Sequence, residues 1–142
     1  MAHATMSDPV VVDSSVAFKW LWPEGESSVE EAAALLDAHL AGEIALCGPA
    51  ILPVEMSNAV LCSSSSTENA LLLVEAIPLL RIELFEASAV RLLAAAGLTR
   101  RYRLTIYDAL YLHLAEELGC PLVTADRRAF ARIFDSAEIR LI

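Results

Sequence analysis

The sequence has few of the features that mark secreted or membrane-bound proteins. Its three cysteines, Cys47, Cys62 and Cys120, have a spacing that fits neither a disulfide framework nor a Cys-x-x-Cys zinc motif. No uninterrupted apolar run is long enough to span a membrane, because Glu75 and Pro78 break the most hydrophobic stretch. The basic start of a secretory signal is also missing. We therefore expect a cytoplasmic protein with buried thiols and no contact with a membrane.

The motifs of several large enzyme classes are absent as well. The chain contains no Gly-x-Ser-x-Gly, Walker A or Gly-x-Gly-x-x-Gly sequence, so triad hydrolases, P-loop NTPases and dinucleotide enzymes have no site here. The three histidines, His3, His39 and His113, lack the spacing of metal ligands. The chemistry of this protein must therefore depend on other residue types.

Positive charge is scarce. Ten Lys and Arg residues stand against nineteen Asp and Glu residues, which gives a formal net charge of −9. Binding to nucleic acid normally depends on Lys and Arg side chains that neutralise phosphates. If nucleic acid is a ligand, another source of positive charge must take part.

The residues that are present favour one folded domain with a large core. Hydrophobic residues make up 56% of the 142 residues, whereas glycine and proline contribute only five and six. The first seven residues carry no pattern. We therefore expect a single domain over residues 8–142, preceded by a disordered extension over residues 1–7.

Strand and helix signals alternate along this domain. Short apolar runs predict buried strands at residues 9–12, 44–47, 79–84, 121–124 and 139–142. Apolar residues at helical spacing predict helices at residues 14–22, 28–40, 53–60, 89–97 and 107–118, and Gly97 is expected to end the fourth of these. Two further helices are expected, one that begins after a cap at Ser65 and a short one after residue 126. The alternation predicts a three-layer α/β/α sandwich around a central, mainly parallel sheet of four to five strands.

Four acidic residues follow the predicted strands or open the helices after them. Asp13 follows the first strand, Glu55 lies in the first turn after the second, Asp108 opens the penultimate helix and Asp126 follows the fourth strand. Each has an alternative explanation as a helix cap or a first-turn acid. Because the carboxyl ends of parallel strands meet at one edge, however, the four are expected to lie together. Their joint placement favours a functional site.

A cluster of carboxylates needs a counter-charge. Two like charges about 4 Å apart repel each other by roughly 4 kcal/mol at an effective dielectric constant of about 20. A divalent cation satisfies this need. Oxygen ligands without paired His or Cys favour Mg²⁺ or Mn²⁺ over zinc.

Four blocks of the sequence resemble those of PIN-domain ribonucleases, and most closely the VapC toxins of toxin–antitoxin pairs. The blocks are residues 12–24, 52–60, 104–115 and 122–128, and the resemblance spans residues 9 to 135. It implies a PIN-like fold, a Mg²⁺- or Mn²⁺-dependent endoribonuclease activity, and a small antitoxin as partner. It also implies that Asp13, Glu55, Asp108 and Asp126 are the catalytic and metal-binding acids, with Asp13 and Asp108 as the most direct ligands.

The resemblance and the sequence around the acids suggest further site residues. Thr124 matches the small hydroxyl residue that supports the site, Asn58 lies one helical turn after Glu55, and Ser14 follows Asp13. Residues 63–80 contain no Lys or Arg. RNA contact is therefore expected from Lys19, Arg100, Arg101, Arg103, Arg127 and Arg128.

Two other interpretations of the four acids are possible. The first is a Mg²⁺-dependent phosphatase of α/β type, although Asp13 is followed by Ser14-Ser15 and not by a second Asp two positions later. The second is a PIN-like module that binds a partner without catalysis.

The helical aromatics Tyr107 and Tyr111 are expected in a core or an interface. The apolar composition predicts a homodimer.

Overall fold

Five parallel strands form the centre of the protein, and a computed structural model describes residues 6–142. The strands are β1 (Asp8–Val12), β2 (Ile44–Pro49), β3 (Glu83–Phe85), β4 (Leu122–Thr124) and β5 (Ile139–Leu141), and their order in the sheet is β3-β2-β1-β4-β5. All four pairings are parallel. The predicted parallel sheet is confirmed. Residues 1–5 of the expected extension lie outside the described residues.

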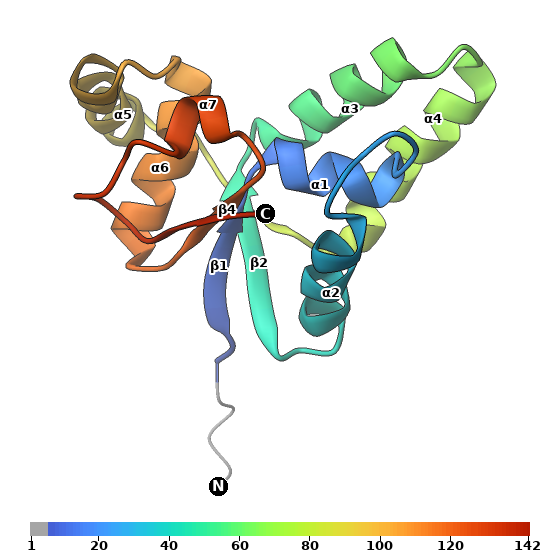
Figure 1. Ribbon diagram of the computed structural model, residues 1–142, viewed down its shortest axis with the longest axis horizontal. Helices are drawn as coiled ribbons and strands as arrows, with labels where there is room; N and C mark the ends of the chain where they lie inside the picture. Colours follow the sequence, from blue (N-terminus) through green and yellow to red (C-terminus); the bar gives the residue numbers. More distant parts are fainter. Residues whose placement is uncertain (1–5) are drawn as a thin grey trace, which may run out of the picture.

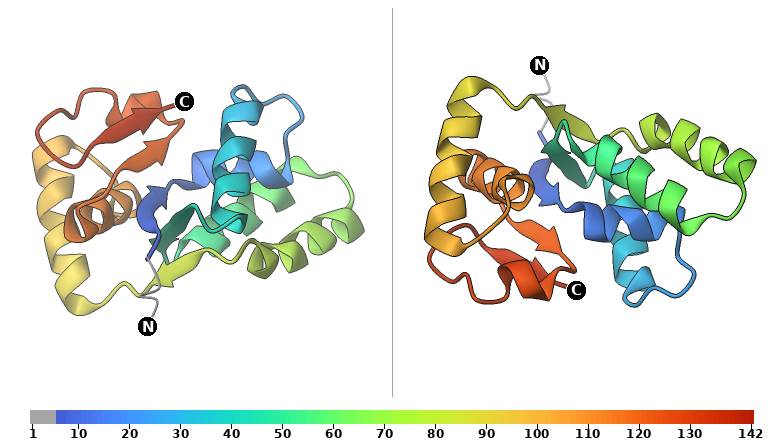
Figure 2. Two further views of the ribbon diagram at one scale, coloured as in Figure 1. Left: turned by 90° about the horizontal axis from the view of Figure 1, so that it is seen from below. Right: turned by 90° about the horizontal axis from the view of Figure 1, so that it is seen from above.

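Seven α-helices cover the sheet within the described residues. They are α1 (Ser14–Leu21), α2 (Val29–Leu40), α3 (Leu52–Ser63), α4 (Thr67–Ala76), α5 (Ala89–Tyr102), α6 (Ile106–Leu118) and α7 (Arg127–Phe130). Helices α5 and α6 lie on one side of the sheet, whereas α1 to α4 lie on the other (Figures 1 and 2). This arrangement is the predicted α/β/α sandwich. In residues 6–142, no helix combines the length and the hydrophobicity that crossing a bilayer requires.

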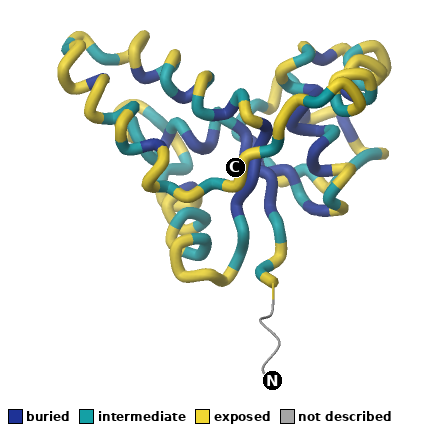
Figure 3. Tube along the Cα trace, turned by 180° about the vertical axis from the view of Figure 1, so that it is seen from behind, coloured by how far each residue is buried: buried dark blue, intermediate teal, exposed yellow. Residues whose placement is uncertain are grey.

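The core lies where the central strand meets the helices. Val11 and Val12 of β1 are fully buried, as are Ala109 and Leu112 of α6. Figure 3 shows this burial concentrated in the middle of the molecule. The inner strands β1 and β4 contribute buried apolar runs because helices cover both faces of the sheet. The packing gives the carboxyl edge of β1 a rigid base.

The connections create a switch point between β1 and β4. From β1 the chain moves outward through β2 and β3, and it then returns to place β4 and β5 on the other side of β1. Val12 of β1 pairs with Val123 of β4, and the backbone N–H of Asp13 donates to the carbonyl of Val123 at 3.0 Å. Ligands of such sheets bind beyond the carboxyl ends of the strands at this point.

The predicted strand at residues 79–84 is only partly correct. A 3-10 helix, η1 (Ile77–Leu80), includes its first two residues, and β3 begins only at Glu83. Proline is compatible with a first helical turn, and Pro78 lies in the first turn of η1. Arg81 then takes a left-handed conformation with φ 56°, which ends the turn. Leu79 is 74% exposed and is not part of a buried strand.

Three further local predictions are wrong. Helix α5 continues through Gly97 and ends at Tyr102, where Arg103 adopts a left-handed φ of 57°. A single glycine costs a helix only about 1 kcal/mol, which tertiary packing overrides. The cap of α4 is Ser66 and not Ser65, since its Oγ accepts the N–H of Asn69. Of the three free thiols, Cys62 is exposed, whereas Cys47 and Cys120 are buried as expected.

His39, which the sequence does not set apart, joins three elements. Its Nδ1 accepts the backbone N–H of Leu46 at 3.0 Å, so the proton lies on Nε2, which donates to the carbonyl of Leu80 at 3.0 Å. Replacing His39 with Ala is expected to lower the free energy of unfolding by about 1–3 kcal/mol, because it leaves these backbone groups unpaired. Urea denaturation measures the change.

His113→Ala is the matched control for this substitution. Within the described residues its ring makes one polar contact, with Glu117 of the same helix at 3.6 Å. We expect a smaller loss of stability than for His39→Ala. Equal losses in the two variants would contradict the structural role of His39.

Candidate active site

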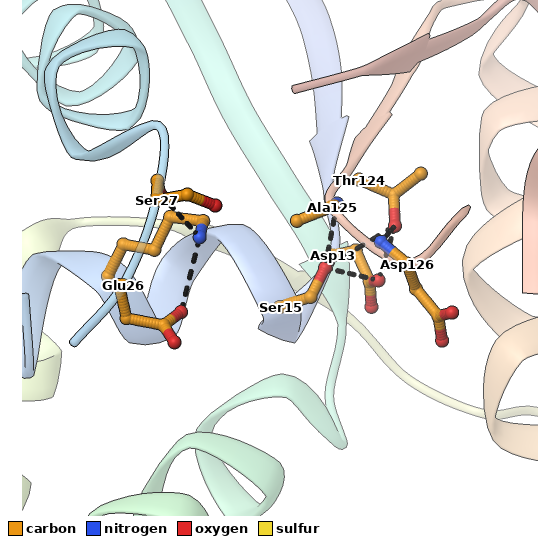
Figure 4. Close-up of polar contacts among 8 residues, drawn as sticks. Asp13, Ser15, Glu26, Ser27, Thr124, Ala125 and Asp126 are labelled. Carbon is orange, nitrogen blue, oxygen red and sulfur yellow. Dashed lines mark hydrogen bonds and ion pairs between the residues drawn. The ribbon is translucent and has the colours of Figure 1, made fainter. Parts of the chain in front are cut away.

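Asp13 lies at the centre of the carboxyl edge. It occupies the position before α1 with an extended backbone, but its side chain accepts no capping hydrogen bond from that helix. Its Oδ2 instead accepts hydrogen bonds from Thr124 Oγ1 at 2.7 Å and Ser15 Oγ at 2.8 Å (Figure 4). Only 3% of Asp13 is exposed. Helix capping therefore does not account for this residue.

The surroundings of Asp13 disfavour its negative charge. Burial raises the pKa of Asp13 above its usual value, although the hydroxyls of Thr124 and Ser15 oppose that rise. The charge of Asp126 raises the pKa of Asp13 further. An ionised Asp13 consequently costs free energy unless a cation lies beside it.

Glu55 is held from a different helix. It lies in the first turn of α3, is half-buried, and accepts a hydrogen bond on Oε1 from the Tyr111 hydroxyl at 2.7 Å. Burial raises the pKa of Glu55, and the nearby charges of Asp13 and Asp108 raise it further, while the bond from Tyr111 lowers it. The carboxylate is therefore both oriented and electrostatically coupled to the other acids.

Tyr111 is a site residue that sequence reasoning assigned to a core or an interface. Its ring is buried with 1% exposed, and it lies one turn after Asp108 on α6. The signal that could have found it is the Asp108-x-x-Tyr111 spacing, which puts both side chains on one side of the helix. Tyr111 thereby links the acid of α3 to the acid of α6. Tyr107, by contrast, is 52% exposed.

Asp108 and Asp126 line one cavity, and both interact electrostatically with Asp13. Asp108 lies in the first turn of α6, where Thr105 forms the cap, and Asp126 caps α7 by accepting the N–H of Ala129 on Oδ1 at 3.0 Å. Burial raises the pKa of Asp108, and so do the charges of Asp13 and Asp126. The four acids thus lie on one edge and act on one another.

The donor set of this edge fits a hard divalent cation. Within residues 6–142, every ion pair of a Lys or Arg side chain involves an acid other than Asp13, Glu55, Asp108 and Asp126. None of these four carboxylates is therefore neutralised by a side chain in this range. Oxygen ligands of this kind suit Mg²⁺ or Mn²⁺. In the described part of the chain, no three His, Cys, Asp or Glu side chains converge at the spacing of one ion.

The supporting residues differ in part from those expected. Thr124 is fully buried and, besides its bond to Asp13, accepts the N–H of Asp126 at 3.0 Å. A second hydroxyl contact to Asp13 comes from Ser15, which also accepts the N–H of Ala125 at 2.9 Å, and not from Ser14. Asn58 is exposed, and its contact is with Cys62 rather than with an acid.

The residues predicted to contact RNA differ in exposure and in their ion pairs. Lys19 is buried with 4% exposed, and its Nζ donates to Glu26 at 3.2 Å and to the Ser27 carbonyl at 2.7 Å (Figure 4). Because Lys19 is buried, it is not one of the exposed cations that RNA could contact. Arg101 is exposed but paired with Asp135 at 2.7 Å. Of the predicted contacts, Arg100, Arg103, Arg127 and Arg128 are exposed and have no acidic partner in the described residues.

Comparison with solved structures shows the same fold in several proteins. VapBC2 from Rickettsia felis, bound to a promoter DNA fragment, matches with a TM-score of 0.69 and 18% identity over 94% of this chain and 98% of that chain. DNA-bound VapBC from Salmonella typhimurium matches with a TM-score of 0.67 and 18% identity over 93% and 96%. VapBC-5 from Mycobacterium tuberculosis matches with a TM-score of 0.57 and 19% identity over 94% and 98%.

The fold and the site define an α/β/α protein with a carboxylate cluster at the switch point of a parallel sheet. The family model of the PIN domain matches residues 10–134. The chain belongs to the PIN-domain family, a family of nucleases. No curated protein matches the chain at a significant level.

Proposed function

We propose that the protein is a Mg²⁺- or Mn²⁺-dependent endoribonuclease that hydrolyses phosphodiester bonds of RNA. The observation that carries this proposal is Asp13, which is buried at the switch point and held by two hydroxyls. It is electrostatically coupled to three further acids. Such an arrangement has no structural benefit of its own, because burial of like charges destabilises the fold.

The four acids have different proposed roles in metal binding. Asp13 and Asp108 would hold the ion directly, while Glu55 and Asp126 would complete its surroundings through water. When bound, a divalent cation lowers the pKa of a water molecule and stabilises the charge that develops on the phosphate. Thr124 and Ser15 orient Asp13 for this purpose, and Tyr111 orients Glu55.

We further propose that the protein is the toxin of a type II toxin–antitoxin pair. The structures to which it is similar include VapBC toxin–antitoxin complexes. An edge with four uncompensated acids suits a small antitoxin that inserts a basic side chain. Large exposed apolar side chains support a homodimer, namely Val90 and Leu93 on α5 and, on the other side of the sheet (Figure 1), Leu71 and Leu72 on α4. A monomeric mass in light scattering at micromolar concentration would count against that dimer.

Two experiments separate the nuclease from the phosphatase and from the binding module without catalysis. Purified protein is incubated with single-stranded RNA and, in parallel, with a chromogenic phosphate ester, each with Mn²⁺. We expect cleavage within the RNA and no turnover of the ester. The reverse result would identify a phosphatase. Expression of the native chain and of Asp13→Ala in cells then tests a pure binding role, since a binder would arrest growth equally in both forms.

Thr124→Val tests how the site is held. Valine keeps the shape of threonine but removes the donor to Asp13 and the acceptor for the N–H of Asp126. Loss of a residue that orients a metal ligand typically costs about 10–100-fold in activity or metal affinity. We expect RNA cleavage to fall by that factor and to require more Mn²⁺, as measured by metal titration.

Thr99→Val provides the comparison for this variant. The Thr99 hydroxyl donates to the carbonyl of Ala96 on α5 and does not touch the acids. Its cleavage rate should equal that of the native protein. A Thr124→Val protein with native activity and native metal requirement would show that Thr124 does not orient Asp13.

A further inference from the structure

The positive charges are distributed unevenly around the acidic edge. Of the ten Lys and Arg residues, four are paired with acids, namely Lys19, Arg91, Arg101 and Arg140. Among residues 6–142, the six without an acidic partner include five that lie between residues 100 and 132. These five are Arg100, Arg103, Arg127, Arg128 and Arg132. They belong to the end of α5, the turn that follows it, and the segment of α7.

Three of these arginines line a cavity together with two acids of the candidate site. The cavity has a volume of about 350 Å³ and is lined by Arg103, Thr105, Asp108, Asp126, Arg128 and Arg132, among others. This volume lies within the range of about 300–1,000 Å³ that is typical of small-ligand pockets. A ligand in the cavity would contact guanidinium groups and the metal-binding edge at the same time.

Arg132 is the residue of this group that the sequence does not single out. Its Nη2 donates to the carbonyl of Tyr102 at 2.9 Å, which ties the guanidinium to the end of α5. A carbonyl orients the group without cancelling its charge. Arg103 is also constrained, since it holds the left-handed position that ends α5 and precedes the buried Leu104. Both cations are therefore attached to ordered backbone.

The opposite side of the acidic edge offers no comparable attraction. Between Lys19 and Arg81 the sequence contains no Lys or Arg, so α2, α3 and α4 carry no cation. A polyanion that reached the acids from that side would meet only their repulsion. A polyanion that crossed α5 and α7 would meet the unpaired arginines first. The charge distribution thus favours a single direction of approach.

We propose that the cavity of Arg103, Arg128 and Arg132 binds an RNA phosphate next to the one that is cleaved. This inference rests on the proposed nuclease function. Guanidinium groups form paired hydrogen bonds with phosphate oxygens, and fixed guanidinium groups lose little entropy in doing so. Asp108 and Asp126 form the wall that adjoins the metal-binding edge. The RNA backbone accordingly passes over α5 and α7, and α3 and α4 stay free of it.

Binding of a fluorescent single-stranded RNA tests the site apart from cleavage. The Asp13→Asn protein serves as the background, so that the RNA stays intact while anisotropy is measured over a range of salt concentrations. We expect Arg103→Ala and Arg132→Ala each to raise Kd about tenfold. Each should also lower the slope of log K against log salt by about 0.7, the value for one phosphate contact on a single strand.

Two controls make the outcome decisive. Arg81→Ala removes a cation at the C-terminal end of η1 that has no acidic partner in the described residues, and it should leave Kd unchanged. Circular dichroism melting of Arg132→Ala checks that its contact with Tyr102 is not needed for folding, and Arg103→Ala tests the site without that contact. If both variants bind RNA as tightly as the background protein, or if Arg81→Ala weakens binding equally, the site is wrong.

The native protein distinguishes this result from failure of the nuclease proposal. If native protein cleaves RNA but Arg103→Ala and Arg132→Ala leave its KM unchanged, the phosphate site is overturned and the nuclease proposal stands. If native protein cleaves no RNA with Mn²⁺, the nuclease proposal itself fails. Where the proposal holds, KM rises about tenfold in each variant, whereas kcat stays within about twofold.

Discussion

Replacing Asp13 with asparagine is expected to abolish RNA cleavage and, in metal-free protein, to raise the melting temperature. The amide keeps the size of the carboxylate, and its oxygen can still accept the hydroxyls of Thr124 and Ser15. It removes the negative charge from a residue that is only 3% exposed. Catalysis and stability therefore change in opposite directions, as is common where a site is built from strained or destabilised groups.

The expected sizes follow from the two roles of the charge. A metal ion contributes several kcal/mol to transition-state stabilisation, so loss of a direct ligand is expected to lower kcat by about 10³-fold or more. Relief of about 1 kcal/mol of buried-charge cost raises Tm by roughly 3–5 °C for a domain of this size. RNA cleavage assays and calorimetry in EDTA measure the two effects.

Asp37→Asn is the matched control for Asp13→Asn. Asp37 is an exposed residue of α2, so the same chemical change there should alter neither cleavage nor Tm. An Asp13→Asn protein that cleaves RNA at the native rate would overturn the proposed site. An Asp13→Asn protein that melts below the native protein in EDTA would show that the buried charge is compensated.

Removal of divalent metal is expected to stop RNA cleavage completely, and Mn²⁺ or Mg²⁺ should restore it. The four carboxylates lack a cationic side-chain partner in the described residues, so the ion is the charge that they need. Binding to the folded state alone also stabilises it, by about 2.7 kcal/mol at a metal concentration of about 100 times Kd. Cleavage is measured in EDTA and after addition of metal, with Tm followed in parallel.

The Asp13→Asn protein supplies the control for this metal effect. Its Tm should respond to Mn²⁺ much less than that of the native protein, because a direct ligand is missing. Full cleavage activity in EDTA would contradict metal dependence. An equal rise of Tm in both proteins would place the ion somewhere other than the acidic edge.

The stability of metal-free protein should depend on pH through the same residues. The folded-state pKa values of Asp13, Glu55 and Asp108 lie above their usual values of 3.8, 4.5 and 3.8. Their contribution to stability is therefore fully present below these usual values and is lost as pH rises through the folded pKa values. The difference in unfolding free energy between Asp13→Asn and native protein in EDTA should grow as pH rises. A difference that is constant with pH would contradict the shift at Asp13.

The strand and helix pattern could be predicted because it depends on local periodicity. The apolar run before Asp13 and the helical spacing after Asp108 appear in the structure as β1 and α6. The end of α5 could not be predicted in the same way. Gly97 is a helix terminator by local preference, and packing of α5 against α6 carries the helix past it.

By itself, the sequence determined the α/β alternation and the position of each acid directly after a strand or in the first turn of a helix, since both follow from spacing along the chain. Only the tertiary structure decided the partners of side chains. It buried Lys19 against Glu26, brought Tyr111 to Glu55, and tied Arg132 to the end of α5 beside the acids. The physical reason is that a hydrogen bond or ion pair depends on distances between residues remote in sequence, and the packing of whole elements sets those distances.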